Sequence, residues 1–164
     1  MNESKFARAL RSLCEAGVQF ILVGGVAAAL HGITIDTLDV DIVPMRTEEN
    51  LARLLAVLES LDAVYRIQPE RRLKPTPAHL QSRGHQNLIT TLGPLDVLGT
   101  IGRGHGYEDL LPHTVEIQLG DGTSVRMLDL ETIIAIKEEV GGEKDLAALP
   151  LLRRALKERQ KPTP

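Results

Sequence analysis

The chain has 164 residues, with 19 Lys and Arg against 22 Asp and Glu, and 43% of its residues are apolar. This length and balance fit one globular domain with a hydrophobic core and exclude a polycation or a disordered tail. Aromatic residues make up only 2%, so we expect an aliphatic core and no aromatic platform for stacking bases. The one cysteine, Cys14, allows neither an intrachain disulfide nor a cysteine zinc cluster, which fits a reducing cytoplasm.

The N-terminal segment carries charges throughout and lacks the apolar stretch of a signal peptide. Residues 16–35 include no charged residue and approach the length of a membrane span. Four glycines interrupt this stretch, and Gly24 and Gly25 lie at its middle. A buried strand, a tight turn and a short helix therefore explain it better than a span. We expect a soluble cytoplasmic protein with no membrane partner.

The first third of the chain is predicted to alternate helices with short buried strands. In order, these elements are a helix at 3–16, a strand at 19–23, a helix at 26–30, a strand at 39–43 and a helix at about 48–61. Gly17 ends the first helix, and Thr47 is the expected N-cap of the last one.

Residues 62–85 hold three prolines and a cluster of basic side chains, which predicts a short strand near 63–67 and then a loop. The basic residues are Arg66, Arg71, Arg72, Lys74 and Arg83. After them we expect strands at 87–91 and 95–98, joined by a turn at Gly93 and Pro94, and then a glycine-rich connection at 99–106. A hairpin of strands at 115–119 and 124–127 is expected next. Two helices end the chain, one at about 130–139 capped by Asp129 and one at about 144–158 with Pro150 as an internal start or kink. Together the elements predict an α/β (α+β) fold in a single domain, 1–164, with a small mixed sheet and flanking helices.

Asp39 and Asp41 are separated by one residue within a predicted strand. Side chains two positions apart on a strand point to the same face, so these carboxylates project together, roughly 6–7 Å apart along the chain. Because neighbouring carboxylates repel each other, a cation that prefers oxygen ligands, Mg²⁺ or Mn²⁺, would relieve the conflict by binding between them. The alternative is a solvated strand end, where aspartates are common.

Asp96 lies in the apolar strand expected at 95–98, so its carboxylate faces either water or a charged group. Strand pairing that brings Asp96 beside Asp39 and Asp41 would complete a site for two metal ions about 3.5–4 Å apart, as in phosphoryl-transfer centres.

Gly24 and Gly25 lead from a strand directly into a helix. Glycines at such a turn let backbone N–H groups approach a phosphate, although the same turn is frequent in purely structural roles. The segment matches neither the Walker A motif nor GxGxxG.

Lys137 follows Ile133 and Ile134 on the core-facing stripe of a helix. Its ammonium either extends past the helix end or lies near an anionic site, where it could hold a triphosphate.

Other chemistry has little support in the sequence. His31, His85 and His105 lie apart, without an HExxH motif or a cysteine partner, which argues against a zinc site. No Ser or Cys lies in a GxSxG nucleophile elbow. Residues 102–106 include three glycines and form either a substrate loop, with Arg103 as a phosphate contact, or a plain flexible turn.

The order of these features along the chain is that of a Gly-Gly turn opening a helix, an Asp-x-Asp strand about a dozen residues later, and a third Asp on a neighbouring strand. The residues are Gly24, Gly25, His31, Gly32, Thr37, Asp39, Asp41 and Asp96, followed by matching segments at 107–108, 130–137 and 144–146. This pattern resembles the DNA-polymerase-beta-like nucleotidyltransferase superfamily, and within it the small bacterial nucleotidyltransferase-like proteins related to toxin–antitoxin nucleotidyltransferases. The resemblance covers about residues 18–155, which would form the core of a nucleotidyltransferase fold.

The resemblance implies a Mg²⁺- or Mn²⁺-dependent reaction in which an acceptor hydroxyl attacks the α-phosphorus of an NTP and pyrophosphate leaves. The implied catalytic and metal-binding residues are Asp39, Asp41 and Asp96, and the implied nucleotide-binding residues are Gly24, Gly25, Thr37 and Lys137. The acceptor would be an RNA end, a protein hydroxyl or a small alcohol, and the basic stretch at 66–83 could help to bind it.

Ile35 departs from the family pattern, because relatives often carry Arg two positions before the Thr of the Asp-x-Asp motif. A cation lost there would weaken nucleotide binding or mark a member that no longer catalyses. The resemblance therefore leaves two function classes open: a nucleotidyltransferase, and a non-catalytic nucleotide- or partner-binding module on the same fold, such as one component of a toxin–antitoxin pair. A third reading is an RNA-binding protein that uses the basic stretch without chemistry.

Overall fold

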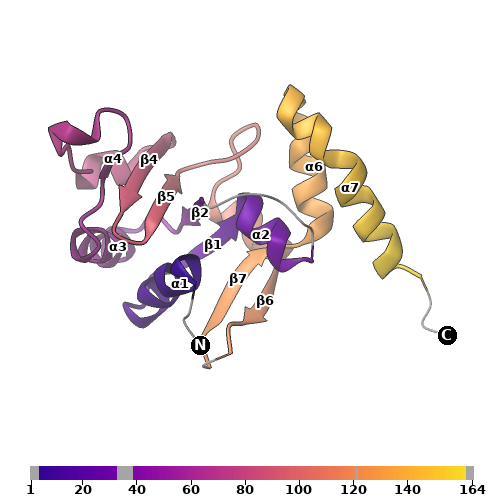
Figure 1. Cartoon of the computed structure of the whole chain (residues 1–164), viewed down its shortest axis with the longest axis horizontal. Coiled ribbons are helices and arrows are strands. Elements are labelled where there is room, and N and C mark those ends of the chain that lie inside the picture. Colours follow the sequence, from indigo (N-terminus) through magenta and orange to yellow (C-terminus); the bar gives the residue numbers. More distant parts are fainter. Residues whose placement is uncertain (1–3, 33–38, 121, 162–164) are drawn as a thin grey trace.

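The computed structural model describes residues 4–32, 39–120 and 122–161, and within these ranges the chain forms one seven-stranded sheet with helices around it (Figure 1). The strands are β1 (Phe20–Val23), β2 (Val40–Pro44), β3 (Val64–Tyr65), β4 (His85–Thr90), β5 (Gly93–Leu98), β6 (Thr114–Gln118) and β7 (Ser124–Leu128). The α-helices are α1 (Lys5–Glu15), α2 (Gly24–Leu30), α3 (Glu48–Ser60), α4 (Pro77–Gln81), α5 (Tyr107–Leu110), α6 (Leu130–Val140) and α7 (Glu143–Arg159), and the 3₁₀ helices are η1 (Pro69–Arg71) and η2 (Leu111–His113).

The sheet is mixed, and its strand order is β3-β4-β5-β2-β1-β7-β6. β2 pairs in parallel with β5, and β1 pairs in parallel with β7, whereas the other neighbours are antiparallel. This order places β2, which carries the Asp-x-Asp motif, between β1 and β5 in the middle of the sheet. The predicted α/β fold with a mixed sheet and flanking helices is confirmed.

The core is aliphatic, as the composition predicts. All four residues of β1 are buried, and Leu10, Leu13, Leu54 and Leu58 bring fully or almost fully buried side chains from α1 and α3. Residues on the leucine stripes face the sheet because their spacing keeps them on one side of each helix.

Helix ends follow the predicted capping residues. The Thr47 hydroxyl accepts a hydrogen bond from the Asn50 N–H at the start of α3, and the Asp129 carboxylate accepts one from the Thr132 N–H at the start of α6. These bonds satisfy backbone donors that a helix start otherwise leaves free, so both helices begin where the sequence indicates.

The prediction of an unbroken loop after the short strand near 63–67 is wrong, because η1 and α4 lie within it. Pro77 occupies the first turn of α4, where its missing N–H costs nothing, and the Thr76 hydroxyl caps the helix by accepting from the His79 N–H. The prolines here therefore begin a helix. α5 and η2, within 107–113, were likewise not predicted.

The predicted turn at Gly93 and Pro94 is also misplaced, since both residues belong to β5. The chain turns at residues 91–92, where the Thr90 hydroxyl donates to the Gly93 carbonyl at 2.8 Å and accepts from the Leu92 N–H at 3.0 Å. This threonine, rather than the Gly-Pro pair, organises the connection between β4 and β5.

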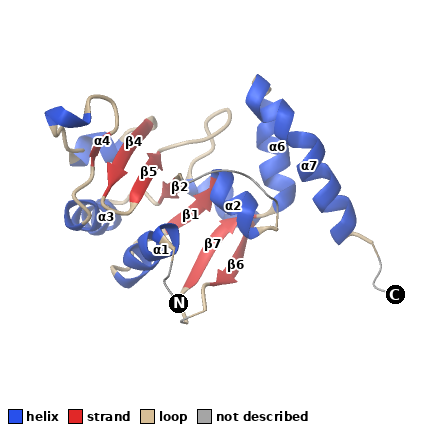
Figure 2. Ribbon diagram, viewed as in Figure 1, coloured by secondary structure: helices blue, strands red, loops and turns tan. Residues whose placement is uncertain are grey.

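The C-terminal helices α6 and α7 form a hairpin at the side of the sheet away from α3 and α4 (Figure 2). α7 begins at Glu143 and continues through Pro150, so no helix starts at this proline. Two ion pairs join the hairpin, Lys137 with Asp145 and Glu138 with Arg153. Across the described ranges, every helix is too short or too polar to cross a lipid bilayer.

Candidate active site

Strand pairing brings Asp41 and Asp96 together. β2 and β5 run in parallel with Asp41 opposite Asp96, and on its other side Asp41 lies opposite Val23, the last residue of β1. Opposed residues on neighbouring strands point to the same face of a sheet, so the two carboxylates lie side by side. Val40 and Ile42 are buried in the core, as the alternation along the strand predicts.

The Asp41 carboxyl is strongly perturbed. Its pKa is raised from 3.8 to about 7, first by burial, then by the charge of Asp96 and a hydrogen bond with its carboxylate, and then by the charge of Asp39; Arg66 opposes the shift. All of the raising causes disfavour a negative charge on Asp41. Without a cation, Asp41 is therefore partly protonated near neutral pH.

Gly24 closes one side of Asp41. This glycine is the first residue of α2 and has a φ of +75°. A Cβ atom built on Gly24 would overlap the Asp41 carboxylate, with Oδ2 as the nearest atom. Both the backbone conformation and the close approach thus require glycine here. Gly25 is the second residue of α2 and does not line the cavity described below.

Asp96 has a cation beside it that the sequence did not indicate. The Arg66 guanidinium lies with Nη1 3.1 Å from Asp96 Oδ1, and its Nη2 donates to Asp96 Oδ2 at 3.3 Å. Asp96 is buried, with 7% of its surface exposed. Asp96 Oδ1 is buried and accepts no hydrogen bond from the described residues; the 3.1 Å approach of Arg66 is electrostatic and lacks hydrogen-bond geometry.

A cavity of about 180 Å³ adjoins Asp41 and gathers three of the predicted site residues. Gly24, Asp41 and Lys137 line it. The Lys137 Nζ lies 3.3 Å from Asp145 Oδ1, so its ammonium reaches the cavity while paired to α7. The other lining residues are mainly apolar: Val23, Leu98, Ile101, Gly102, Leu128, Ile133, Ile136, Val140 and Asp145.

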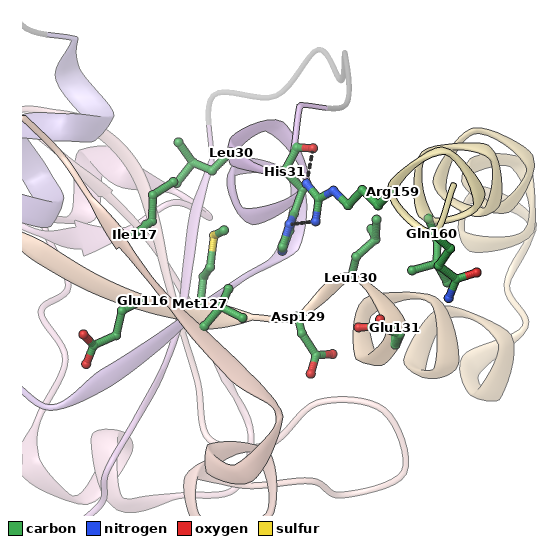
Figure 3. A pocket seen from close by; sticks show the side chains of 12 residues that line it. Leu30, His31, Glu116, Ile117, Met127, Asp129, Leu130, Glu131, Arg159 and Gln160 are labelled. Atoms are coloured by element: carbon green, nitrogen blue, oxygen red, sulfur yellow. Dashed lines mark hydrogen bonds between the residues drawn. The ribbon is translucent and has the colours of Figure 1, made fainter. Parts of the chain in front are cut away.

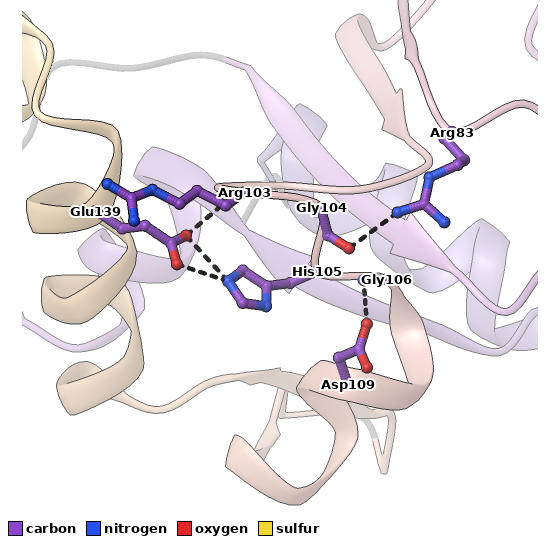
Figure 4. A network of polar contacts seen from close by, with 7 residues as sticks. All are labelled: Arg83, Arg103, Gly104, His105, Gly106, Asp109 and Glu139. Carbon is purple, nitrogen blue, oxygen red and sulfur yellow. Dashed lines mark hydrogen bonds and ion pairs between the residues drawn. The ribbon is translucent and has the colours of Figure 1, made fainter.

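The glycine-rich connection at 99–106 forms one wall of this cavity and is tied to α6 (Figure 4). The Glu139 carboxylate accepts from the Arg103 N–H at 2.9 Å and lies 3.0 Å from His105 Nε2. The hydrogen bond from His105 lowers the pKa of Glu139, helped by the Arg103 N–H. Arg103 therefore contributes a backbone contact to a fixed turn, and Arg83 donates to the Gly104 carbonyl at 3.2 Å from the other side.

Asp41 fits a divalent cation that prefers oxygen ligands. Burial and the neighbouring carboxylates of Asp96 and Asp39 disfavour its negative charge, and a bound cation would offset these causes. Asp39 lies close enough for its charge to raise the pKa of Asp41. Across residues 4–32, 39–120 and 122–161, however, no three His, Cys, Asp or Glu side chains are arranged as ligands of one metal ion. The predicted nucleotide-binding residue Thr37, like Ile35, lies outside the described residues.

A second polar cluster lies around the buried His31 at the far end of α7, beside a cavity of about 520 Å³ (Figure 3). Arg159 donates to His31 Nδ1 at 2.8 Å and to the His31 carbonyl at 2.6 Å. Since arginine only donates, His31 Nδ1 is an acceptor and Nε2 carries the proton, which it donates to the Leu128 carbonyl at 2.8 Å. Every polar atom of this imidazole is thus satisfied.

Comparison with known proteins gives a match in structure alone: no protein-family model and no curated protein matches the sequence. A crystal structure from Thermotoga maritima, described as that of a "putative nucleotidyltransferase", superimposes with a TM-score of 0.55 over 97% of each chain at 18% identity. The chain has the nucleotidyltransferase fold. At this identity the likeness concerns the fold, and it says nothing of a toxin–antitoxin relation.

Proposed function

We propose that this protein is a metal-dependent nucleotidyltransferase that moves an NMP from an NTP to an acceptor hydroxyl. The observation that carries the proposal is the pair of Asp41 and Asp96 on adjacent parallel strands, beside a glycine turn, in a nucleotidyltransferase fold. A stable fold gains nothing from such crowded carboxylates, because burial and mutual repulsion both oppose their charge. A bound cation and a phosphate substrate explain the arrangement.

In this proposal Asp39 and Asp41 would hold Mg²⁺ or Mn²⁺, which when bound supplies the positive charge that neutralises the triphosphate. Lys137, at the cavity beside Asp41, binds the phosphates as a second positive charge. Because Gly24 has no side chain, the backbone at the start of α2 lies directly against the Asp41 carboxylate and lines the cavity in which the phosphates would bind.

Asp96 takes part in the transfer step. In the proposal the acceptor hydroxyl gives its proton to the Asp96 carboxylate, which lies beside Asp41 on the neighbouring strand. The hydroxyl oxygen forms its bond to the α-phosphorus while the bond from that phosphorus to the bridging oxygen of the β-phosphate breaks, and pyrophosphate leaves. The acceptor is an RNA end, a protein hydroxyl or a small alcohol.

Incubation with each α-labelled NTP, Mg²⁺ and either total RNA or total protein tests the proposal. We expect label in one acceptor fraction, and EDTA abolishes it. Asp41→Asn and Asp96→Asn reduce transfer by at least about 10³-fold. Asp62→Asn is the matched control, because Asp62 is a surface carboxylate paired with Arg72, and it keeps wild-type transfer. Transfer that both active-site variants retain would refute the proposal.

One observation favours a second candidate, a non-catalytic nucleotide- or partner-binding module such as a toxin–antitoxin component with a cognate partner. Arg66 already neutralises Asp96, as in a centre that no longer needs a cation there. This candidate predicts Mg²⁺-dependent NTP binding with no labelled product from any acceptor, whereas the enzyme gives product with at least one.

A further inference from the structure

Arg66 reaches Asp96 across an intervening strand. Arg66 follows β3, and its backbone N–H donates to the Asn87 carbonyl on β4 at 3.0 Å. Asn87 is in turn the register partner of Asp96 on β5. The Arg66 side chain crosses β4, where Nη1 donates to the Leu88 carbonyl at 3.3 Å. The sheet thus fixes both the origin and the direction of this guanidinium.

The pair differs from an ordinary surface ion pair. Only 11% of the Asp96 side chain and 36% of the Arg66 side chain are exposed, and both guanidinium Nη atoms approach the carboxylate. Ion pairs at this depth are screened less by solvent and salt than exposed ones. Arginine also stays protonated at any pH the protein meets, so the positive charge is permanent.

The charges of the centre favour one divalent ion. Arg66 supplies a positive charge directly to Asp96, and the same charge also opposes the raised pKa of Asp41. The proposed function places one divalent ion beside Asp39 and Asp41. A second ion at Asp96 would lie next to a guanidinium that is 3.1 Å from the same carboxylate, and the two cations would repel each other.

We propose that Arg66 takes the place of a second metal ion: its guanidinium neutralises and orients Asp96, and the centre binds one divalent cation per chain. This inference rests on the proposed function, which supplies the cation. It makes Arg66 a positioning residue for the reaction, a role that the other basic residues of 66–83 do not share. Their side chains are exposed, as those of Arg71 and Arg72 show.

The number of Mn²⁺ ions bound tests the inference without any measurement of activity. Titration of full-length protein with Mn²⁺ alone, read from the electron paramagnetic resonance signal of free Mn²⁺, gives one ion per chain for wild type. Arg66→Gln gives two ions, the first about tenfold tighter because a nearby positive charge is gone. Arg66→Lys keeps one ion. Arg72→Gln, which removes an exposed arginine paired with Asp62, also keeps one.

Two ions on wild-type protein, or one ion on Arg66→Gln, would overturn the role of Arg66. The outcome separates this inference from the proposed function. Wild type with two ions and labelled product keeps the transferase and refutes the inference. One ion without product keeps the inference as a description of the cation site and refutes the transferase. No ion at millimolar Mn²⁺ refutes both.

Discussion

Two polar clusters of this protein, one around the buried His31 and one at Asp41 and Asp96, differ in how completely their polar atoms are satisfied. At His31, each ring nitrogen and the carbonyl have a hydrogen-bond partner, although Arg159 and Leu128 come from distant parts of the chain. At Asp41 and Asp96, two carboxylates lie side by side, the pKa of Asp41 is raised to about 7, and the buried Asp96 Oδ1 accepts no hydrogen bond from the described residues. Satisfied groups stabilise a fold, whereas crowded acidic groups cost stability and are kept for a function.

The largest effect is expected where the backbone touches the carboxylate cluster. Gly24→Ala adds a Cβ that overlaps the Asp41 carboxylate in a left-handed conformation, so it destabilises the protein by about 3 kcal/mol and abolishes Mn²⁺ binding. Gly32→Ala is the matched control, because Gly32 has a φ of +88° but open space around it, and it costs only about 1 kcal/mol. Urea unfolding measures the stability of both variants, and Mn²⁺ titration measures their metal binding. Equal effects of the two substitutions would show that contact with Asp41 does not require glycine at position 24.

The satisfied cluster is expected to respond in stability alone. His31→Ala removes a buried side chain and its hydrogen bonds with Arg159 Nη1 and the Leu128 carbonyl, while Arg159 Nη2 keeps its bond to the backbone carbonyl; the loss costs about 2–3 kcal/mol. His113→Ala, at an exposed histidine, changes stability by less than about 0.5 kcal/mol. Urea unfolding measures the loss, and Mn²⁺ binding by folded His31→Ala equals that of wild type. A folded His31→Ala protein that loses Mn²⁺ would show that this cluster, too, serves the site.

The crowded cluster gives metal-free protein a distinctive pH dependence. Because the pKa of Asp41 is raised from 3.8 to about 7, the folded state binds more protons than the unfolded state between these values. The contribution of Asp41 to the unfolding free energy is therefore most favourable below pH 3.8 and is lost as the pH rises to about 7. Asp41→Asn lacks this fall, so at pH 8 in EDTA we expect it to be about 1–3 kcal/mol more stable than wild type.

Urea unfolding at several pH values between 4 and 8 measures this difference. Saturating Mn²⁺ reverses the order, because the cation stabilises wild type and not the variant. Parallel pH profiles of the two proteins in EDTA would mean that the Asp41 carboxylate is not destabilising and that its repulsion from Asp96 is not relieved by a metal.

The smallest effect concerns Lys137. Lys137→Ala weakens NTP binding by about tenfold, while the loss of its single, half-buried ion pair with Asp145 changes stability by only about 1 kcal/mol. Arg153→Ala removes the other ion pair of the hairpin, with Glu138, and leaves NTP affinity unchanged. Equilibrium binding of a labelled NTP distinguishes them. Unaltered affinity of Lys137→Ala, with a loss of stability, would make this lysine a packing residue.

The sequence carries the parts of this structure that depend on local patterns. The period-two alternation of residues 39–43 places Asp41 on the other face of the strand from the buried Val40 and Ile42. The capping side chains of Thr47 and Asp129 locate the starts of two helices. The resemblance supplies the pairing that brings Asp96 to Asp41, because register between distant strands is not a local property.

Contacts between distant residues left no signal in the sequence. Arg66 lies among several basic residues, and nothing at position 66 distinguishes the guanidinium that crosses β4 to Asp96. His31 and Arg159 are 128 positions apart, and their contact depends on how α7 folds back along α6. Local chemistry misled at Pro77, where a proline was expected in a loop and instead begins α4.

The most direct measurement is a crystal soaked with a non-hydrolysable NTP analogue and Mn²⁺, with the anomalous signal of manganese recorded. We expect one manganese peak, held by Asp39 and Asp41 together with the phosphates, while Arg66 stays on Asp96. A nucleotide and metal bound elsewhere, or well-ordered density with no manganese at these carboxylates, would contradict it.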